Sequence, residues 1–301
     1  MADGKMHADE VETDVSLVRR LLAGQFPQWA DLRIEPVASA GTDHAIYRLG
    51  DEMSVRLPRI HWAVGQVEKE WEWFPKLAPH LPLAIPTPLA KGEPGEGFPN
   101  PWLVSPWIPG EDATEDHLRD LSEAAVDLAG FILALQRIDT AGAPLPGPTG
   151  RGVPLAVRDE YTRNGIARSE GLVDIEAVTA AWEAALAASA WDGEPVWIHG
   201  DLLPGNVLAR HGRVSAVIDW GPLVGDPAAE LTVAWSLFSG ESRAGFRAAL
   251  GVDDATWARG RGWALSTAIL ELPYYIDTNP AIVAKARHRI AEVLADHKSG
   301  A

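Results

Sequence analysis

The spacing of apolar residues changes partway along this sequence of 301 residues, and that change limits the folds available to it. In roughly the first third, short apolar runs alternate with turn residues, a pattern that predicts β-strands. These runs lie at 32–37, 45–50, 53–58 and 101–108. Gly50-Asp51 is a candidate hairpin turn between the second and third runs. Helical patterns at 15–26 and 64–77 accompany the strands, and Pro75 is expected to fray the end of the second helix.

Beyond this part of the chain, helical spacing dominates. One helical face is expected between 115 and 138, formed by Leu118, Leu121, Ala125, Leu128, Ile132 and Leu135. Three short strands are expected at 196–198, 207–209 and 215–218. Most of 228–297 again has helical spacing. The sequence therefore predicts an α+β fold with a β-rich N-terminal lobe, residues 1–107, and a mainly helical C-terminal lobe, residues 108–301.

Charge and composition exclude several classes of protein. The formal net charge is −16 at pH 7, which argues against a surface for nucleic acid or anionic membrane. The chain has no cysteine, so disulfides and zinc–thiolate sites are excluded. The start of the sequence is polar and acidic, unlike a signal peptide, and no apolar run reaches the roughly 18 residues of a membrane span. We therefore expect a cytoplasmic protein, and nothing in the sequence implies an obligate protein partner.

The most informative motif is His199-x-Asp201-x-x-x-x-Asn206, followed by Asp219 at the end of an apolar strand. The spacing matches the catalytic loop and metal-binding aspartate of kinases. Phosphoryl transfer requires one carboxylate that orients the acceptor hydroxyl and accepts its proton, a role that suits Asp201. It also requires oxygen ligands that hold Mg²⁺ on the nucleotide phosphates, a role that suits Asn206 and Asp219.

Each of these residues also has a purely structural interpretation. Asp201 with the following Pro-Gly can form a turn, Asn206 can cap a turn, and Asp219 can end a strand. We interpret His199 as a structural, hydrogen-bonding histidine and Asp226 as a helix N-cap before a proline. The joint spacing favours the catalytic interpretation over turns alone. The chain contains no G-x-x-x-x-G-K-[ST] motif, so a P-loop kinase is excluded.

The segment VWIHGDLLPGNVLARHGRVSAVIDWGPLVGDPAAELTVAW resembles the catalytic core of the aminoglycoside phosphotransferase family, antibiotic kinases with a protein-kinase-like fold. SAGTDHAIYRLGDEMSVRLPR resembles the nucleotide-binding hairpin of that family, NPWLVSPWIPGED its inter-lobe hinge, and ELPYYIDTNP a helix of its substrate lobe. The resemblance covers roughly residues 30–290. It implies a bilobal kinase that uses ATP or GTP with Mg²⁺.

The resemblance also implies nucleotide-binding residues in the first lobe. The loop that contains Thr42 would cover the phosphates. Arg56 occupies the place of the usual phosphate-binding lysine, with Glu70, or less favourably Glu68, as its partner on the following helix. The structural alternative is a surface Arg–Glu pair of little energetic value. By alignment, the carbonyl of Ser105 and the amide of Trp107 would contact the base, without deciding between ATP and GTP.

The same resemblance places the acceptor pocket near Glu271, Tyr274, Tyr275 and Asp277. Acidic groups would suit a polycationic aminoglycoside, and aromatic rings would suit a macrolide. On a helix, Glu271 and Tyr275 would share one face, and Tyr274 and Asp277 another. Both substrate classes therefore remain open.

Three functions are compatible with these residues. The first is a small-molecule kinase that phosphorylates a hydroxyl group of an antibiotic. The second is a metabolic kinase for a sugar, an amino alcohol or a natural-product intermediate, because the motif does not define the acceptor. The third is a nucleotide-binding pseudokinase, which the replacement of lysine by Arg56 would favour. A protein kinase is disfavoured, because the chain has neither a D-F-G nor an A-P-E motif with an activation segment between them.

Overall fold

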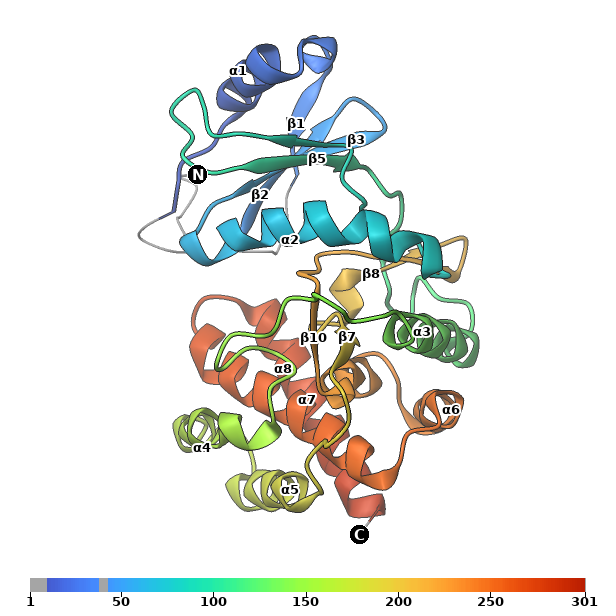
Figure 1. Cartoon of the computed structure of the whole chain (residues 1–301). Coiled ribbons are helices and arrows are strands. Elements are labelled where there is room, and N and C mark those ends of the chain that lie inside the picture. The colour runs from blue at the N-terminus through green and yellow to red at the C-terminus, as the bar shows by residue number, and fades with distance from the viewer. Residues whose placement is uncertain (1–9, 38–42, 301) are drawn as a thin grey trace. The chain divides into compact units, whose positions relative to one another are not determined.

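The computed structural model of the chain describes residues 10–37 and 43–300. Its contacts group the chain into two compact units, which we describe one at a time (Figure 1). The first unit contains residues up to Pro79 together with Ala84–Pro109. The second unit contains His80–Leu83 and Gly110–Ala301.

The first unit is built on a five-stranded antiparallel sheet in the order β1-β2-β3-β5-β4 (Figure 1). Its strands are β1 (Ile34–Pro36), β2 (His44–Leu49), β3 (Met53–Pro58), β4 (Ala90–Gly92) and β5 (Trp102–Pro106). Its helices are α1 (Val15–Gln25), η1 (Pro27–Trp29) and α2 (His61–Leu77), with η2 (Ala78–His80) following α2. The four strands expected from alternating apolar runs are therefore confirmed, and β4 is an additional short strand.

The core of this unit forms where α1 packs on the sheet. Leu21, Leu49, Val55 and Trp102 are fully buried within one apolar cluster. The turn between β2 and β3 begins at Gly50, whose φ of 57° lies in the left-handed region that glycine adopts without strain. This confirms the hairpin expected at Gly50-Asp51.

Helix α2 follows β3 directly and continues past Pro75 to Leu77. Proline removes one intrahelical donor, and near a C-terminus only the last turn is affected. The expected fraying is not seen, because the helix runs through Pro75 to Leu77 and the Ala78 amide donates to the Phe74 carbonyl oxygen. Phe74 and Leu77 are fully buried at this end, so packing compensates for the lost hydrogen bond.

The second unit contains two small antiparallel sheets. In the first, β7 (Val196–Ile198) pairs with β10 (Leu223–Gly225). In the second, β8 (Val207–Arg210) lies between β6 (Glu111–Asp112) and β9 (Arg213–Val217). The three strands predicted from the sequence are β7, β8 and β9. The 3-10 turn η4 (Pro204–Asn206) leads into β8.

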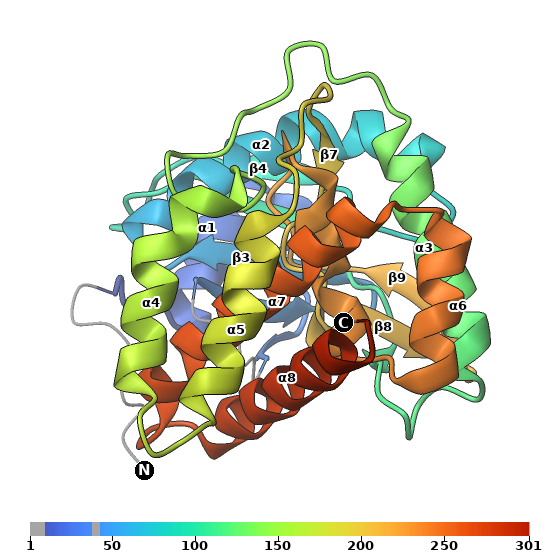
Figure 2. The ribbon, with the colours of Figure 1, turned by 90° about the horizontal axis from the view of Figure 1, so that it is seen from below.

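The other regular elements of this unit are helices, as expected. They are α3 (Leu121–Gln136), η3 (Leu155–Arg158), α4 (Asp159–Arg168), α5 (Ile175–Ala187), η5 (Pro227–Trp235), α6 (Gly240–Leu250), α7 (Asp254–Tyr275) and α8 (Pro280–Ser299). Helix α7 is central and contacts α4, α5, α8 and η5, with α8 running beside it in Figure 2. A Cβ at Gly260 would lie 2.7 Å from the Leu231 side chain, so this glycine permits α7 to approach η5.

Candidate active site

His199 follows β7 and holds the start of the catalytic loop through both ring nitrogens. Its Nε2 lies 3.0 Å from the Ile218 carbonyl oxygen, and its Nδ1 accepts the Asp201 amide at 3.1 Å. The imidazole is buried and stacks on Trp220, with ring centroids 5.6 Å apart. Burial lowers the pKa of His199, which favours the neutral ring that donates at one nitrogen and accepts at the other. These contacts support the structural interpretation of His199.

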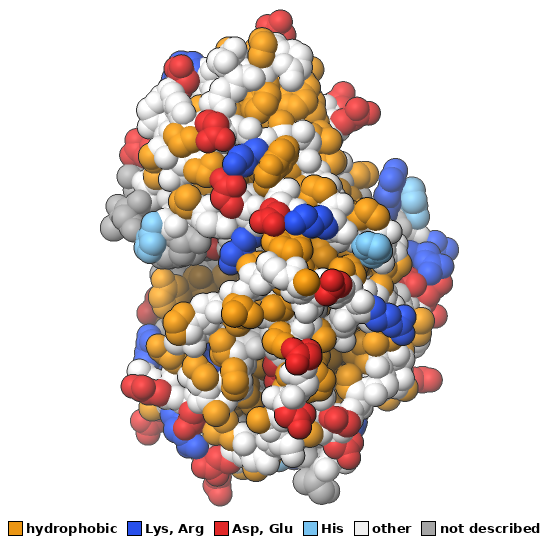
Figure 3. All heavy atoms as spheres, in the orientation of Figure 1, with side chains coloured by type: hydrophobic (Ala, Val, Ile, Leu, Met, Phe, Trp, Pro, Cys, Tyr) orange, Lys and Arg blue, Asp and Glu red, His pale blue; other side chains and the backbone are white. Residues whose placement is uncertain are grey.

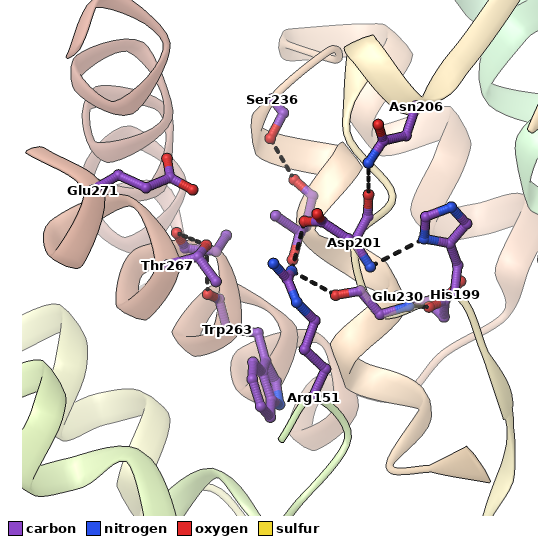
Figure 4. Close-up of polar contacts among 12 residues, drawn as sticks. Arg151, His199, Asp201, Asn206, Glu230, Ser236, Trp263, Thr267 and Glu271 are labelled. Carbon is purple, nitrogen blue, oxygen red and sulfur yellow. Dashed lines mark hydrogen bonds and ion pairs between the residues drawn. The ribbon is translucent and has the colours of Figure 1, made fainter. Parts of the chain in front are cut away.

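Hydrogen bonds to backbone groups hold Asp201, Asn206 and Asp219 close together in the second unit. The Asn206 side-chain Nδ2 donates to the Asp201 carbonyl oxygen at 2.8 Å (Figure 4). The Asn206 carbonyl oxygen accepts the Ile218 amide at 2.9 Å, which places the end of β9 opposite the start of β8. Asp219 is the next residue, so all three side chains originate at one end of the β8–β9 hairpin.

Asp219 has a φ of 55°, a left-handed conformation that only a few per cent of non-glycine residues adopt. Aspartate tolerates this conformation better than most residues. The next residue, Trp220, is buried and donates from Nε1 to the Ile198 carbonyl oxygen at 3.0 Å. Anchoring of Trp220 inside the unit leaves the side chain of Asp219 exposed. Such conformations concentrate at functional sites.

The donor chemistry of Asn206 and Asp219 fits Mg²⁺. Because the Nδ2 of Asn206 is used by the Asp201 carbonyl, the amide oxygen is the group left to act as a ligand. Mg²⁺ requires oxygen ligands and usually binds few protein groups together with substrate phosphates and water. Among residues 10–37 and 43–300, no group of three or more His, Cys, Asp or Glu could hold a metal alone.

Glu230, on η5, holds the catalytic loop from the opposite side to the Asn206 bond. It is fully buried, and its Oε1 accepts the amide of Gly200, the residue immediately before Asp201 (Figure 4). Burial raises the pKa of the Glu230 carboxyl to about 7, although hydrogen bonds from the backbone oppose the shift. Glu230 lies thirty-one residues after His199 and belongs to no recognisable motif, so the sequence did not indicate this contact.

Replacement of Glu230 by glutamine is expected to flatten the pH dependence of stability. Because the folded-state pKa of about 7 lies above the ordinary value of 4.5, only the folded state retains the proton between these two pH values. Stability contributed by this group is therefore complete below pH 4.5 and is lost as pH rises through 7, on the order of 3 kcal/mol in total. Urea unfolding between pH 4.5 and 8 measures the slope for Glu230→Gln against the exposed control Glu241→Gln. Parallel profiles for both variants and the parent protein would contradict the assignment.

Arg151 is a site residue that sequence reasoning missed. Its Nη1 lies 2.6 Å from Asp201 Oδ1 and donates to the Gly200 carbonyl oxygen at 2.6 Å (Figure 4). The arginine belongs to the long connection between α3 and η3, nearly fifty residues before the catalytic loop. The connection is rich in glycine and proline, and no pattern in it indicates that Arg151 contacts Asp201. The sequence therefore gave no indication of this contact.

In the first unit, Arg56 and Glu70 form a buried ion pair. Nη1 of Arg56 lies 2.7 Å from Oε2 of Glu70, with side chains 8% and 1% exposed. Glu68 pairs instead with Lys91 at 3.0 Å. The prediction of Glu70 as the partner is confirmed, and the alternative of a surface pair is wrong. Because buried pairs lose most of their hydration, this one requires precise geometry, as the Lys–Glu pair of kinases does.

His44 on β2 also faces Arg56. Its Nδ1 lies 3.5 Å from Nη2 of Arg56. Burial, and then the positive charge of Arg56, hold the pKa of His44 well below its usual value. The ring is therefore neutral beside the arginine, and Arg56 remains the cation of this site.

The proposed base-binding groups of β5 are partly used within the sheet. The Trp107 amide donates to the Glu52 carbonyl oxygen at 2.7 Å, and Ser105 pairs with Ser54 of β3. The Ser54 hydroxyl also lies 3.5 Å from the Ser105 carbonyl oxygen. The Trp107 indole lies under the guanidinium of Arg48, 4.2 Å from its ring centroid. The Ser105 carbonyl and the Trp107 amide, which the alignment assigned to the base, therefore face β3. The sequence alone does not show which edge of β5 is paired with another strand.

Thr42, which was expected to contact the nucleotide phosphates, lies outside the described residues.

The four residues expected in the acceptor pocket lie in different environments. Glu271 is half-buried and pairs with Arg289 at 3.5 Å, and burial raises its pKa. Tyr274 is exposed and makes an edge contact with Tyr275, with ring centroids 4.7 Å apart. Helix α7 ends at Tyr275, so Asp277 lies in an exposed turn and shares no helical face with Tyr274.

Asp226 caps η5, as the sequence predicted, by accepting the Ala228 amide at 2.9 Å. It also forms a buried ion pair with Arg259 of α7, at 2.8 Å, which the sequence did not indicate. Both residues line a cavity of about 360 Å³ together with Gly152 and Trp191. Their charges are mutually neutralised, so this cavity offers no chemistry comparable to the Asp201 loop.

The chain matches a family model described as the phosphotransferase enzyme family over residues 34–263. No curated protein sequence matches it. Among solved structures, the GDP complex of an aminoglycoside 2'-phosphotransferase-IIIa is similar, with 17% identity, a TM-score of 0.70, and coverage of 95% of this chain and 100% of that one. A macrolide 2'-phosphotransferase of type I is 21% identical, with a TM-score of 0.63 and coverage of 93% and 98%.

Two further solved structures add to this comparison. The macrolide 2'-phosphotransferase MphH from Brachybacterium faecium is 23% identical, with a TM-score of 0.60 and coverage of 92% and 97%. A ternary complex of streptomycin, ATP and an aminoglycoside phosphotransferase has 18% identity, a TM-score of 0.60 and coverage of 93% and 97%. These likenesses confirm the expected α+β kinase-like fold. Together with the match over most of its length, they show that the chain belongs to the phosphotransferase enzyme family.

Proposed function

We propose that the protein is a Mg²⁺-dependent small-molecule kinase that transfers the terminal phosphoryl group of ATP or GTP to a hydroxyl group. The observation that carries this proposal is the 2.8 Å bond from the Asn206 amide to the Asp201 carbonyl. It joins the residue that carries the proposed acceptor-side carboxylate to a proposed metal ligand through the backbone. Because this bond uses the Nδ2 of Asn206, it leaves the amide oxygen available as a ligand.

In the proposed reaction, the Asp201 carboxylate accepts a hydrogen bond from the acceptor hydroxyl and orients its oxygen toward the terminal phosphorus. The new O–P bond forms as the bond to the leaving nucleoside diphosphate breaks, and the hydroxyl proton passes to Asp201. The loop must therefore be rigid. His199 and Glu230 support this rigidity by binding the amides of Asp201 and Gly200.

Asn206 and Asp219 would hold Mg²⁺ through their side-chain oxygens. When bound, the ion neutralises charge on the nucleotide phosphates. The left-handed backbone at Asp219 and the buried Trp220 beside it fix the position from which the Asp219 side chain extends. No additional protein ligand is required, because phosphates and water complete the coordination of Mg²⁺.

Residues of the first unit would bind the nucleotide. Arg56, paired with Glu70 and always charged, would contact its phosphates. Because backbone groups alternate between the two edges of a strand, the carbonyl of Pro106, the last residue of β5, lies on the edge away from β3. We propose this carbonyl and the amide of Ile108 for the base edge in place of Ser105 and Trp107. Contact of Thr42 with the phosphates remains a prediction.

The names of the similar structures favour an antibiotic as the acceptor, either an aminoglycoside or a macrolide. A metabolic acceptor remains the second candidate, because Glu271 is neutralised by Arg289, and Asp277 lies in the turn after α7 and not on the helix. These contacts weaken the case for a polycationic acceptor. The buried pair of Arg56 and Glu70 reproduces the charge pattern of active kinases and weakens the pseudokinase alternative.

We also propose that the protein acts in the cytoplasm, where the nucleotides are available, without nucleic acid, membrane or an obligate protein partner. No helix among the described residues combines the length and apolarity needed to cross a bilayer. On the face shown in Figure 3, acidic and basic side chains are interspersed, without a broad basic patch. This distribution and the net charge of −16 support a small-molecule partner.

The experiment that tests the function is a mass-spectrometric screen. The protein is incubated with Mg²⁺ and ATP or GTP against aminoglycosides, macrolides, and sugars and amino alcohols. A phosphate mass gain on one class, with loss of the terminal phosphate of one nucleotide, is expected. If titration calorimetry detects nucleotide binding but no acceptor gains mass, the kinase proposal loses to the pseudokinase. Absence of nucleotide binding would contradict both.

A further inference from the structure

Both backbone groups of Gly200, the residue before Asp201, are held by charged side chains (Figure 4). The Gly200 amide donates to Oε1 of Glu230, which is fully buried. The Gly200 carbonyl oxygen accepts from Nη1 of Arg151 at 2.6 Å. A Cβ at Gly200 would lie only 3.0 Å from the Cβ of Arg151, so the arginine packs directly on the backbone. The catalytic loop is therefore held from two sides immediately before its aspartate.

The residue that follows Arg151 fixes this arginine within the second unit. The amide of Asp226, just after β10, donates to the Gly152 carbonyl oxygen at 2.9 Å. A Cβ at Gly152 would lie 2.5 Å from Cδ1 of Ile198, the last residue of β7. Gly152 thus lies against the two strands β7 and β10, and the catalytic loop directly follows β7. Arg151 therefore reaches the loop from an anchored position.

The two carboxylate oxygens of Asp201 have different surroundings. Nη1 of Arg151 lies 2.6 Å from Oδ1. Oδ1 is shielded from solvent and receives no directed hydrogen bond from any described residue, since the directed bond of Nη1 goes to the Gly200 carbonyl. The Asp201 side chain as a whole is 35% exposed. Oδ2 is therefore the oxygen that a hydroxyl group can approach.

Orientation of this carboxylate matters for the reaction. Phosphoryl transfer requires the acceptor oxygen to lie in line with the phosphorus, and a misplacement of about 1 Å can lower a rate roughly 10²-fold. The terminal torsion of an aspartate side chain has only broad preferences, so the carboxylate needs an external restraint. A guanidinium is permanently charged and planar, so its attraction for one carboxylate oxygen persists at every working pH.

We propose that Arg151 is a positioning residue that restrains the Asp201 carboxylate, so that Oδ2 receives the hydrogen bond of the acceptor hydroxyl. The catalytic part of this inference rests on the proposed function, whereas the restraint of the loop does not. In this role Arg151 touches neither the acceptor nor the nucleotide. It acts through Oδ1 of Asp201 and through the Gly200 carbonyl.

Steady-state kinetics of Arg151→Gln tests the positioning role. We expect kcat to fall about 10–10²-fold, while the KM of the acceptor and the Kd of the Mg–nucleotide complex stay within about threefold of the parent values. Arg151→Lys keeps the charge but not the planar fork, so its kcat should be intermediate. The control is Arg168→Gln, at an exposed arginine of α4, which should leave kcat unchanged. Thermal unfolding verifies folding, and Arg151→Lys provides the comparison if Arg151→Gln does not fold.

Two kinetic results would overturn the proposal. The first is a kcat in the Arg151 variants that equals or exceeds the parent value, since the contact would then be dispensable or inhibitory. The second is a loss confined to KM or Kd, which would indicate that Arg151 contacts a substrate directly.

A double variant tests whether Arg151 acts through Asp201. In the Asp201→Asn background, Arg151→Gln should lower kcat by about twofold or less, because the carboxylate that it positions is already absent. Single-turnover mass spectrometry measures this small residual rate. A further loss as large as that in the parent chain would show an independent role for Arg151 and contradict the proposal.

Hydrogen exchange separates this inference from the proposed function, because it needs no turnover. NMR follows the amides of Gly200 and Asp201, which Glu230 and His199 bind. Arg151→Gln should accelerate their exchange about tenfold, and the Arg168→Gln control should not. Unchanged exchange would overturn the restraint of the loop. If exchange accelerates but the parent chain phosphorylates no acceptor, the kinase proposal fails while the restraint stands.

Discussion

Asp201→Asn is expected to lower kcat by a factor of about 10²–10⁴ while nucleotide affinity stays within about twofold of the parent value. Asparagine has nearly the same shape, but it cannot accept the proton of the acceptor hydroxyl. The amide of residue 201 would still bind His199, and its carbonyl would still accept from Asn206, because both contacts use the backbone. Loss of turnover would therefore reflect chemistry and not a collapsed loop.

The control for this variant is Asp192→Asn, an identical change at an exposed aspartate of the second unit. Steady-state kinetics with the acceptor found by mass spectrometry gives kcat, and calorimetry with Mg–ATP gives affinity. Because the side chain also pairs with Arg151, a small shift in thermal stability is expected. Turnover within about tenfold of the parent chain would remove Asp201 from the role of proton acceptor.

Asp219→Asn is expected to weaken binding of the Mg²⁺–nucleotide complex by roughly tenfold or more, because the metal loses its proposed charged ligand. Asparagine tolerates the left-handed backbone at this position, whereas alanine would add conformational strain at a φ of 55°. The comparison of Asp219→Asn with Asp219→Ala therefore separates the loss of charge from strain. Both variants should lose Mg²⁺-dependent affinity.

This prediction contains its own control. In EDTA, nucleotide affinity should be the same for the parent chain and for Asp219→Asn, because the difference depends on the metal. Titration of Mg²⁺ at fixed nucleotide should then require higher concentrations for the variant. Unchanged affinity in Mg²⁺, or an equal loss in EDTA, would show that Asp219 is not a metal ligand.

Most of the elements that carry the site could be predicted from the sequence. Strands β2, β3, β5, β7, β8 and β9 were expected from alternating or compact apolar runs between turn residues. The pairing of Arg56 with Glu70 was implied by the family resemblance, and the buried pair confirms it. The cap at Asp226 followed from its position before a proline. The strands and the cap depend on residues close in sequence or on the period of one element, which local physics determines.

Only the tertiary structure decided which groups the site uses and which are already engaged. Arg151 meets Asp201 across fifty residues, Glu230 meets Gly200 across thirty, and Arg289 neutralises Glu271 across the α7–α8 connection. The raised pKa of Glu230 exists only because folding removes it from water. Likewise, the Trp107 amide is occupied because β5 lies beside β3. Long-range pairing and burial have no local pattern, since they depend on how separate elements pack.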